Sequence, residues 1–97
     1  MIIVLNCNFK AYVNAIYSAT YKDVSGNQKI SYNLEVFNPE YTGKFDRYLT
    51  LTIDRDCWTR LKLDDSRKTL ERKELNLICS IRPYKVGVGL IVLDILQ

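Results

Sequence analysis

Aromatic and basic side chains stand next to one another at three places in this 97-residue sequence. The pairs are Tyr21-Lys22, Arg47-Tyr48 and Tyr84-Lys85. A cation displaces the counterions of a phosphate backbone, and an aromatic ring stacks on a base for roughly 1–3 kcal/mol. The pairs therefore supply both groups that hold a single-stranded nucleic acid. Tyrosine is also an ordinary strand residue, so a half-buried structural role stays open for each ring.

Few residues could carry catalysis or hold a metal ion. Histidine is absent, and neither a Gly-x-Ser-x-Gly nor a P-loop pattern occurs. Cys7, Cys57 and Cys79 have no Cys-x-x-Cys spacing, which predicts buried free thiols in a reducing compartment. Four aspartates are expected to cap and solvate a helical segment, namely Asp54, Asp56, Asp64 and Asp65. We therefore expect no enzyme, no cofactor and no metal.

The composition predicts one globular domain over residues 1–97. Apolar residues make up 47% of the chain and charged residues 26%, which excludes a disordered protein. The net charge of +3 suits a polyanionic partner only weakly. The apolar run Met1–Leu5 is far shorter than the ~20 residues that span a bilayer. A cytoplasmic location is expected, in the host cell if the protein is viral.

Alternation of apolar and polar residues predicts three strands in the first half of the chain. From Phe9 to Tyr21 every odd position is aromatic, alanine or valine, which indicates a strand with one apolar face. A turn over residues 23–27 leads to a second strand, Gln28–Phe37, and a third follows from Phe45 to Ile53. The apolar positions of these two strands are Ile30, Tyr32, Leu34, Val36, Leu49, Leu51 and Ile53.

The middle of the chain predicts a short helical segment. Asp54-Arg55-Asp56 can cap a helix over residues 56–63, on which Trp58 and Leu61 share one face. Residues 64–66 are expected to break it, and a second polar turn follows through Glu74. The segment is therefore expected to hold one or two short helices, or a helix and a loop.

Two further strands complete the pattern. The fourth is expected from Leu75 to Ile81, and the Gly87-x-Gly89 step turns the chain into a fifth strand, Leu90–Leu96. Three strands, a short helical segment and two strands are the order of the OB-fold, a five-stranded barrel of the all-β class. A generic five-stranded α+β sheet has the same order and remains an alternative.

Three short stretches, in this order and spacing, carry a family resemblance. They are Lys29-Ile30-Ser31-Tyr32-Asn33-Leu34, Phe45 with Leu51-Thr52-Ile53-Asp54, and Tyr84-Lys85-Val86-Gly87 with Gly89-Leu90 through Asp94. They resemble the second strand, the third strand and the last hairpin of the gene V proteins of filamentous phages. The resemblance implies an OB-fold homodimer that coats single-stranded DNA without sequence preference during phage or plasmid replication. Val88 departs from that family, which has an aromatic residue between the glycines.

Parity and the resemblance together select the expected nucleic-acid-binding residues. Parity places Tyr12, Tyr48 and Tyr84 on the polar faces of their strands. The same faces carry Lys10, Lys22, Thr50 and Arg82. Tyr32 falls on an apolar face and is included through the resemblance, which requires a bulge to turn it. The expected site residues are Lys22, Lys29, Tyr32, Lys44, Phe45, Arg47, Tyr48, Arg82, Tyr84 and Lys85.

The fifth strand bears on the partners of the chain. Leu90-Ile91-Val92-Leu93 is apolar on both faces, so something must cover the side turned away from the barrel. A second copy would make a homodimer, whereas the helix over residues 56–63 would make a second copy unnecessary. Single-stranded DNA, with RNA also open, is the expected ligand. The alternative function is a small OB-like or α+β interaction module that binds a protein.

Overall fold

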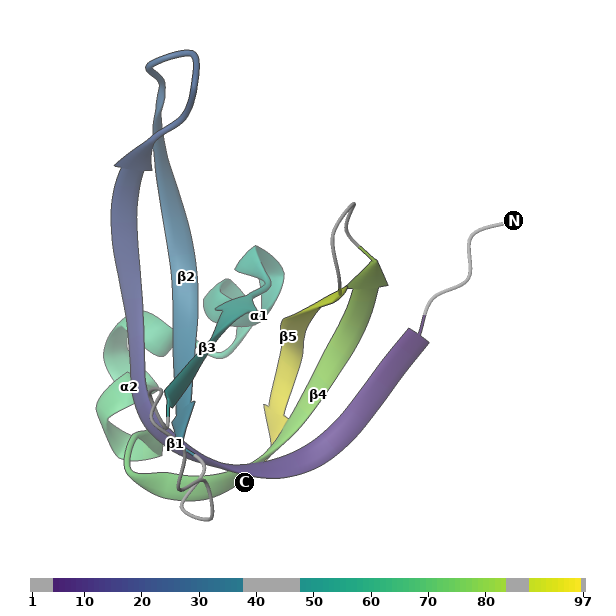
Figure 1. Cartoon of the computed structure of the whole chain (residues 1–97). Helices are drawn as coiled ribbons and strands as arrows, with labels where there is room; N and C mark the ends of the chain where they lie inside the picture. Colours follow the sequence, from purple (N-terminus) through teal and green to yellow (C-terminus); the bar gives the residue numbers. More distant parts are fainter. Residues whose placement is uncertain (1–4, 38–47, 84–87, 97) are drawn as a thin grey trace.

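Five strands and two short helices make up the part of the chain that the computed structural model describes, residues 5–37, 48–83 and 88–96 (Figure 1). The protein is mostly β, and its strands form one closed sheet in the order β1-β2-β3-β5-β4. The elements are β1 (Leu5–Lys22), β2 (Gln28–Phe37), β3 (Tyr48–Ile53), α1 (Arg55–Arg60), α2 (Leu63–Leu70), β4 (Lys73–Pro83) and β5 (Val88–Leu96). Neither of the helices described here is long and apolar enough to cross a membrane.

The sheet closes because β1 is long enough to pair with two strands. Its first half is antiparallel to β4 and its second half antiparallel to β2. Figure 1 shows the strong bend between the two halves. The closing pair is short and parallel, with Thr52 opposite Ile91 and Ile53 opposite Val92.

A β-bulge in β1 lies where the strand changes partners. The register shifts between Val13 and Ala15, so Asn14 is an extra residue. The backbone N–H of Ile16 donates to Glu71 Oε2 at 2.7 Å, and that of Arg72 donates to the carbonyl of Val13 at 2.6 Å. The segment between α2 and β4 therefore supplies partners that the regular ladder lacks at the bulge.

The bulge corrects the predicted parity of β1. One apolar face of odd positions was expected from Phe9 to Tyr21, but Val13 and Ile16 are both fully buried. Beyond the bulge the even positions point inward and the odd positions outward, because one extra residue exchanges the two faces. Tyr17 and Tyr21 thus share the outer face with Tyr12.

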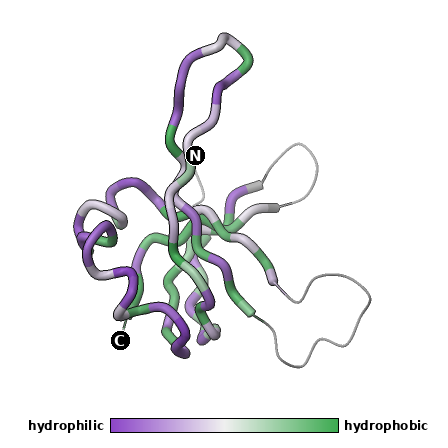
Figure 2. The backbone as a smooth tube through the Cα atoms, turned by 90° about the vertical axis from the view of Figure 1, so that its left-hand side faces the viewer, coloured by the Kyte–Doolittle hydropathy of each residue, from purple (hydrophilic) through white to green (hydrophobic). Residues whose placement is uncertain are grey.

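Residues 18–32 form an arm that extends beyond the closed part of the sheet. The arm consists of the ends of β1 and β2 and the turn between them, which was predicted over residues 23–27. In that turn Gly26 has a φ of +82°, and Asp23 Oδ1 accepts hydrogen bonds from the N–H groups of Ser25 and Asn27. Figure 2 shows the arm projecting, with hydrophobic residues interspersed among hydrophilic ones.

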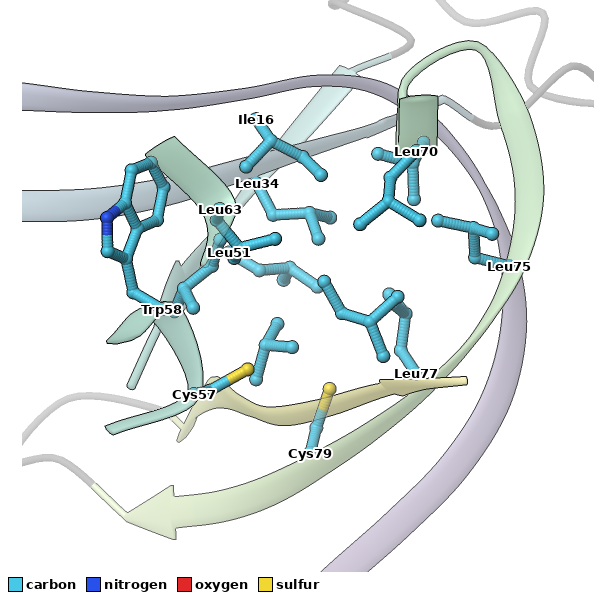
Figure 3. Packing of buried hydrophobic residues seen from close by; sticks show 14 residues of the cluster. Ile16, Leu34, Leu51, Cys57, Trp58, Leu63, Leu70, Leu75, Leu77 and Cys79 are labelled. Carbon is cyan, nitrogen blue, oxygen red and sulfur yellow. The ribbon is translucent and has the colours of Figure 1, made fainter. Parts of the chain in front are cut away.

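The core fills the closed sheet, and both helices contribute side chains to it (Figure 3). Cys57 and Trp58 of α1 and Leu63 and Leu70 of α2 are buried with the inward side chains of the strands. The predicted helix break at residues 64–66 is wrong. The helical segment is interrupted at Lys62, whose φ of 52° is left-handed. Asp64 and Asp65 lie in the first turn of α2, where the helix dipole favours carboxylates.

Two of the three thiols are buried, as predicted, whereas Cys7 is only half-buried. Cys7 lies opposite Cys79 in the β1–β4 pair. Burial raises the pKa of Cys57 to about 11, and burial together with the neighbouring Cys7 does the same for the pKa of Cys79. Both thiols are therefore protonated at neutral pH.

Helix α1 reaches β5 through the side chain of Arg60. The Arg60 guanidinium donates to the carbonyl of Leu93 at 2.8 Å and to Asp94 Oδ1 at 3.3 Å. A second bulge, opposite Ile78 and Cys79, lets both Val92 and Ile95 point inward. The buried side chains of α1, Cys57 and Trp58, pack in the core with Val92, on the inner side of β5.

Candidate nucleic-acid interface

Three aromatic rings form a row across the outer face of the sheet. Tyr12, Phe37 and Tyr48 lie directly opposite one another on β1, β2 and β3. The ring centroids of Tyr12 and Phe37 are 6.1 Å apart, and those of Phe37 and Tyr48 are 5.3 Å apart. Tyr12 is 37% exposed and Tyr48 is 48% exposed. This aromatic row is an accessible stacking surface.

The same face continues from the aromatic row along β2 to the arm. Register places Glu35 beside Thr50, then Asn33 between Tyr17 and Thr52. Farther along, Lys29 lies opposite Tyr21, which is 52% exposed. From Phe37 to Lys29 the face is roughly 27 Å long, at about 3.3 Å per residue. It has rings at both ends, the Glu35 carboxylate with hydroxyl and amide groups between them, and a cation on the arm.

Five of the ten predicted site residues lie within the described ranges, and the structure does not gather them in one place. Tyr48 is in the aromatic row, and Lys29 is on the same face of the arm. Lys22 is on the opposite face of the arm, because the bulge reverses its parity, so its predicted grouping with Tyr12 is wrong. Arg82 is exposed on β4, opposite Gly89. The other five lie outside the described residues, namely Lys44, Phe45, Arg47, Tyr84 and Lys85.

Tyr32, the fifth described residue, faces the helices. Its ring centroid is 4.6 Å from that of Trp58, with the two planes inclined by 30°. It therefore keeps the apolar-face position that parity predicts, and no bulge turns it outward, because the bulge is in β1. Its remaining surface lines a groove between the arm and the start of α1.

Four aromatic residues of this face were missing from the predicted site: Tyr12, Tyr17, Tyr21 and Phe37. Phe37 alternates with Val36 and Leu34, so parity alone could have placed it outside. Tyr17 and Tyr21 require the bulge. Its local signal is the spacing of Val13 and Ile16, which are three positions apart where an unbroken strand would need two or four.

Charge on this surface is modest. Lys10, two residues before Tyr12, lies 4.0 Å from Glu74, and both side chains are exposed. Glu35 Oε1 accepts a hydrogen bond from Asn14 Nδ2 at 2.9 Å. In the part of the chain that the structure describes, Lys22 and Lys29 form no ion pair. The cations of the arm are thus available to a ligand.

Among the described residues, no group of three or more Cys, Asp or Glu side chains is placed to hold a metal ion. Every buried side-chain nitrogen and oxygen described has a hydrogen-bond partner, so no buried polar atom there awaits a ligand.

No protein-family model matches this chain, and no curated protein or solved structure matches it either.

Proposed function

We propose that the protein is a small OB-fold protein that binds single-stranded nucleic acid, DNA in particular, without sequence preference. The strand order supports the OB-fold. One long strand pairs with both β2 and β4, β3 and β5 are parallel, and the helices stand between β3 and β4. OB-folds often bind oligonucleotides on this sheet face and its loops.

The aromatic row carries the proposal. Phe37 packs edge-to-face with Tyr12 and at a tilt with Tyr48, and both tyrosines are exposed. Every base has a π-face, so rings of this kind bind single strands with little regard to sequence. In duplex DNA the bases are already stacked on each other, so the row favours single strands.

Phosphate contacts supply the second contribution. Lys29 and Lys22 on the arm and Arg82 on β4 are exposed cations. Lys44, Phe45 and Arg47 precede the aromatic Tyr48 in the chain, and Tyr84 and Lys85 follow β4, so these predicted residues stay in the proposal. Each phosphate contact releases counterions and makes the affinity depend on salt.

The biological role follows from the resemblance to gene V proteins. It is the coating and protection of single-stranded DNA during phage or plasmid replication, by a homodimer. A protein-binding module is the second candidate, because Ile30 and Leu49 are apolar and more than half exposed.

The test replaces ring and charge separately. Phe37→Ala and Tyr48→Ala should each weaken the binding of a fluorescent oligo-dT by roughly 1–3 kcal/mol, with the salt dependence unchanged. Tyr48→Phe keeps the ring and should retain the affinity. Lys29→Ala should reduce the slope of the logarithm of the binding constant against the logarithm of salt by the contribution of about one phosphate contact. Alanine variants that lose thermal stability but keep full affinity would make the rings structural and refute the interface.

A further inference from the structure

A groove of about 550 Å³ lies between the arm and the start of α1. It exists because β2 is longer than β3. Their last paired residues are Asn33 and Thr52, and the chain then turns into α1 while the arm continues (Figure 1). Its volume is within the range of ~300–1,000 Å³ that is typical of small-molecule sites.

Two tyrosines line the groove. Tyr32 is held in place by Trp58, which is buried, at a centroid distance of 4.6 Å. Tyr21 is exposed and lines the groove from the neighbouring strand of the arm. A flat heterocycle can therefore stack against the Tyr32 ring, which is already fixed, while Tyr21 lies at the rim of the groove on the outer face of the arm.

The polar end of the groove carries a carboxylate and a guanidinium, those of Asp54 and Arg55. Asp54 occupies the N-cap position of α1, yet its side chain makes no capping hydrogen bond. Its backbone N–H is already used, since it donates to the carbonyl of Val92 at 2.9 Å. Among the described residues, neither Asp54 nor Arg55 takes part in an ion pair. Both groups are free to meet a ligand.

The carboxylate of Asp54 distinguishes the four bases by the hydrogen-bond donors that each presents. An ionised carboxylate only accepts hydrogen bonds, through two adjacent oxygens. Guanine presents two adjacent donors, N1–H and N2–H, on its Watson–Crick edge. Adenine and cytosine place one amino donor beside a ring acceptor, and thymine places one N–H between two carbonyls, so each brings a lone pair towards the carboxylate.

We propose that this groove is a guanine subsite on the path of the bound strand. The inference rests on the proposed function and adds a preference at one position to binding that is otherwise independent of sequence. Asp54 accepts both N–H groups, Tyr32 stacks on the ring, Tyr21 lies at the rim of the groove, and Arg55 contacts a phosphate. Ser31 and Thr52 line the groove and belong to the outer face of β2 and β3. The groove is therefore continuous with the surface that carries the aromatic row.

The test compares oligo-dT with the same oligonucleotide carrying one central dG, dA or dC. The dG strand should bind about 5- to 150-fold more tightly, because that is the discrimination that a good bidentate contact provides against a wrong base. Asp54→Asn should abolish this preference and leave the affinity for oligo-dT intact, since asparagine also serves at an N-cap. Asp56→Asn is the matched control, because Asp56 is exposed on α1, outside the groove, and should keep the preference.

Base analogues test the contact itself. Hypoxanthine lacks the N2 amino group and should lose most of the preference, whereas 7-deazaguanine keeps the Watson–Crick edge and should retain it. A wild-type protein that binds oligo-dT but does not distinguish dG would refute the subsite and leave the proposed function standing. A preference that survives Asp54→Asn would refute the assignment to this groove. Failure to bind any single strand would instead refute the proposed function.

Discussion

Replacing Glu71 with alanine should destabilise the protein, because this carboxylate completes the bulge in β1. Glu71 Oε2 accepts the hydrogen bond of the Ile16 backbone at 2.7 Å, and the Ile16 residue is only 1% exposed. Without the acceptor a backbone N–H at a buried position loses its partner. Hydrogen bonds to charged groups are worth about 1.5–3 kcal/mol, and we expect a loss of that size in the free energy of unfolding.

Urea denaturation of matched variants measures this effect. Glu71→Gln keeps a carbonyl acceptor on a side chain of the same length and should lose less stability than Glu71→Ala. Glu74→Ala removes a nearby exposed carboxylate whose pair with Lys10 spans 4.0 Å, and should cost about 0–1 kcal/mol. If Glu71→Ala is no more destabilising than Glu74→Ala, the carboxylate does not hold the bulge, and the account of how β1 changes partners fails.

Three further predictions concern the core and the assembly. The free energy of unfolding should fall as the pH rises from about 9 to about 11, because the folded protein keeps the protons of Cys57 and Cys79 that an unfolded chain releases. Cys79→Ala should make this fall smaller, and an equal fall in that variant would contradict the prediction. Val92→Asp should prevent folding, since Val92 is fully buried, whereas the Ile91→Asp variant, changed on the outer face, should remain folded, as measured by circular dichroism. A folded Val92→Asp variant and an unfolded Ile91→Asp variant would show that the orientation of β5 is wrong. The proposed homodimer should sediment at micromolar concentration as twice 11.3 kDa, and a single 11.3 kDa species would refute it.

The order of the strands along the chain could be predicted from the sequence, because the alternation of apolar and polar residues is a local property. The second strand begins and ends at the predicted residues, Gln28 and Phe37. The helical segment was placed correctly between the third and fourth strands. Its break was misplaced, because a cluster of polar residues looks the same in a loop as in the first turn of a helix, and Asp64 and Asp65 are in the latter.

The candidate site could be predicted only in part, because it depends on contacts between distant residues. Tyr48 and Lys29 were selected and lie on one face. Tyr17 and Tyr21 share that face only through a bulge whose Ile16 N–H bonds to Glu71, 55 positions along the chain. The aromatic row likewise needs the register of three strands, which no single stretch of sequence contains.

We propose that the outer face of β1, β2 and β3 binds single strands. The most direct test of this proposal is the affinity for a fluorescent oligo-dT and for a duplex of equal length, measured over a range of salt concentrations. We predict tighter binding of the single strand, with the logarithm of the binding constant falling linearly with the logarithm of salt, by about 0.7 per phosphate contact. Equal affinity for the duplex, or no binding at low salt, would contradict the account and favour a protein partner.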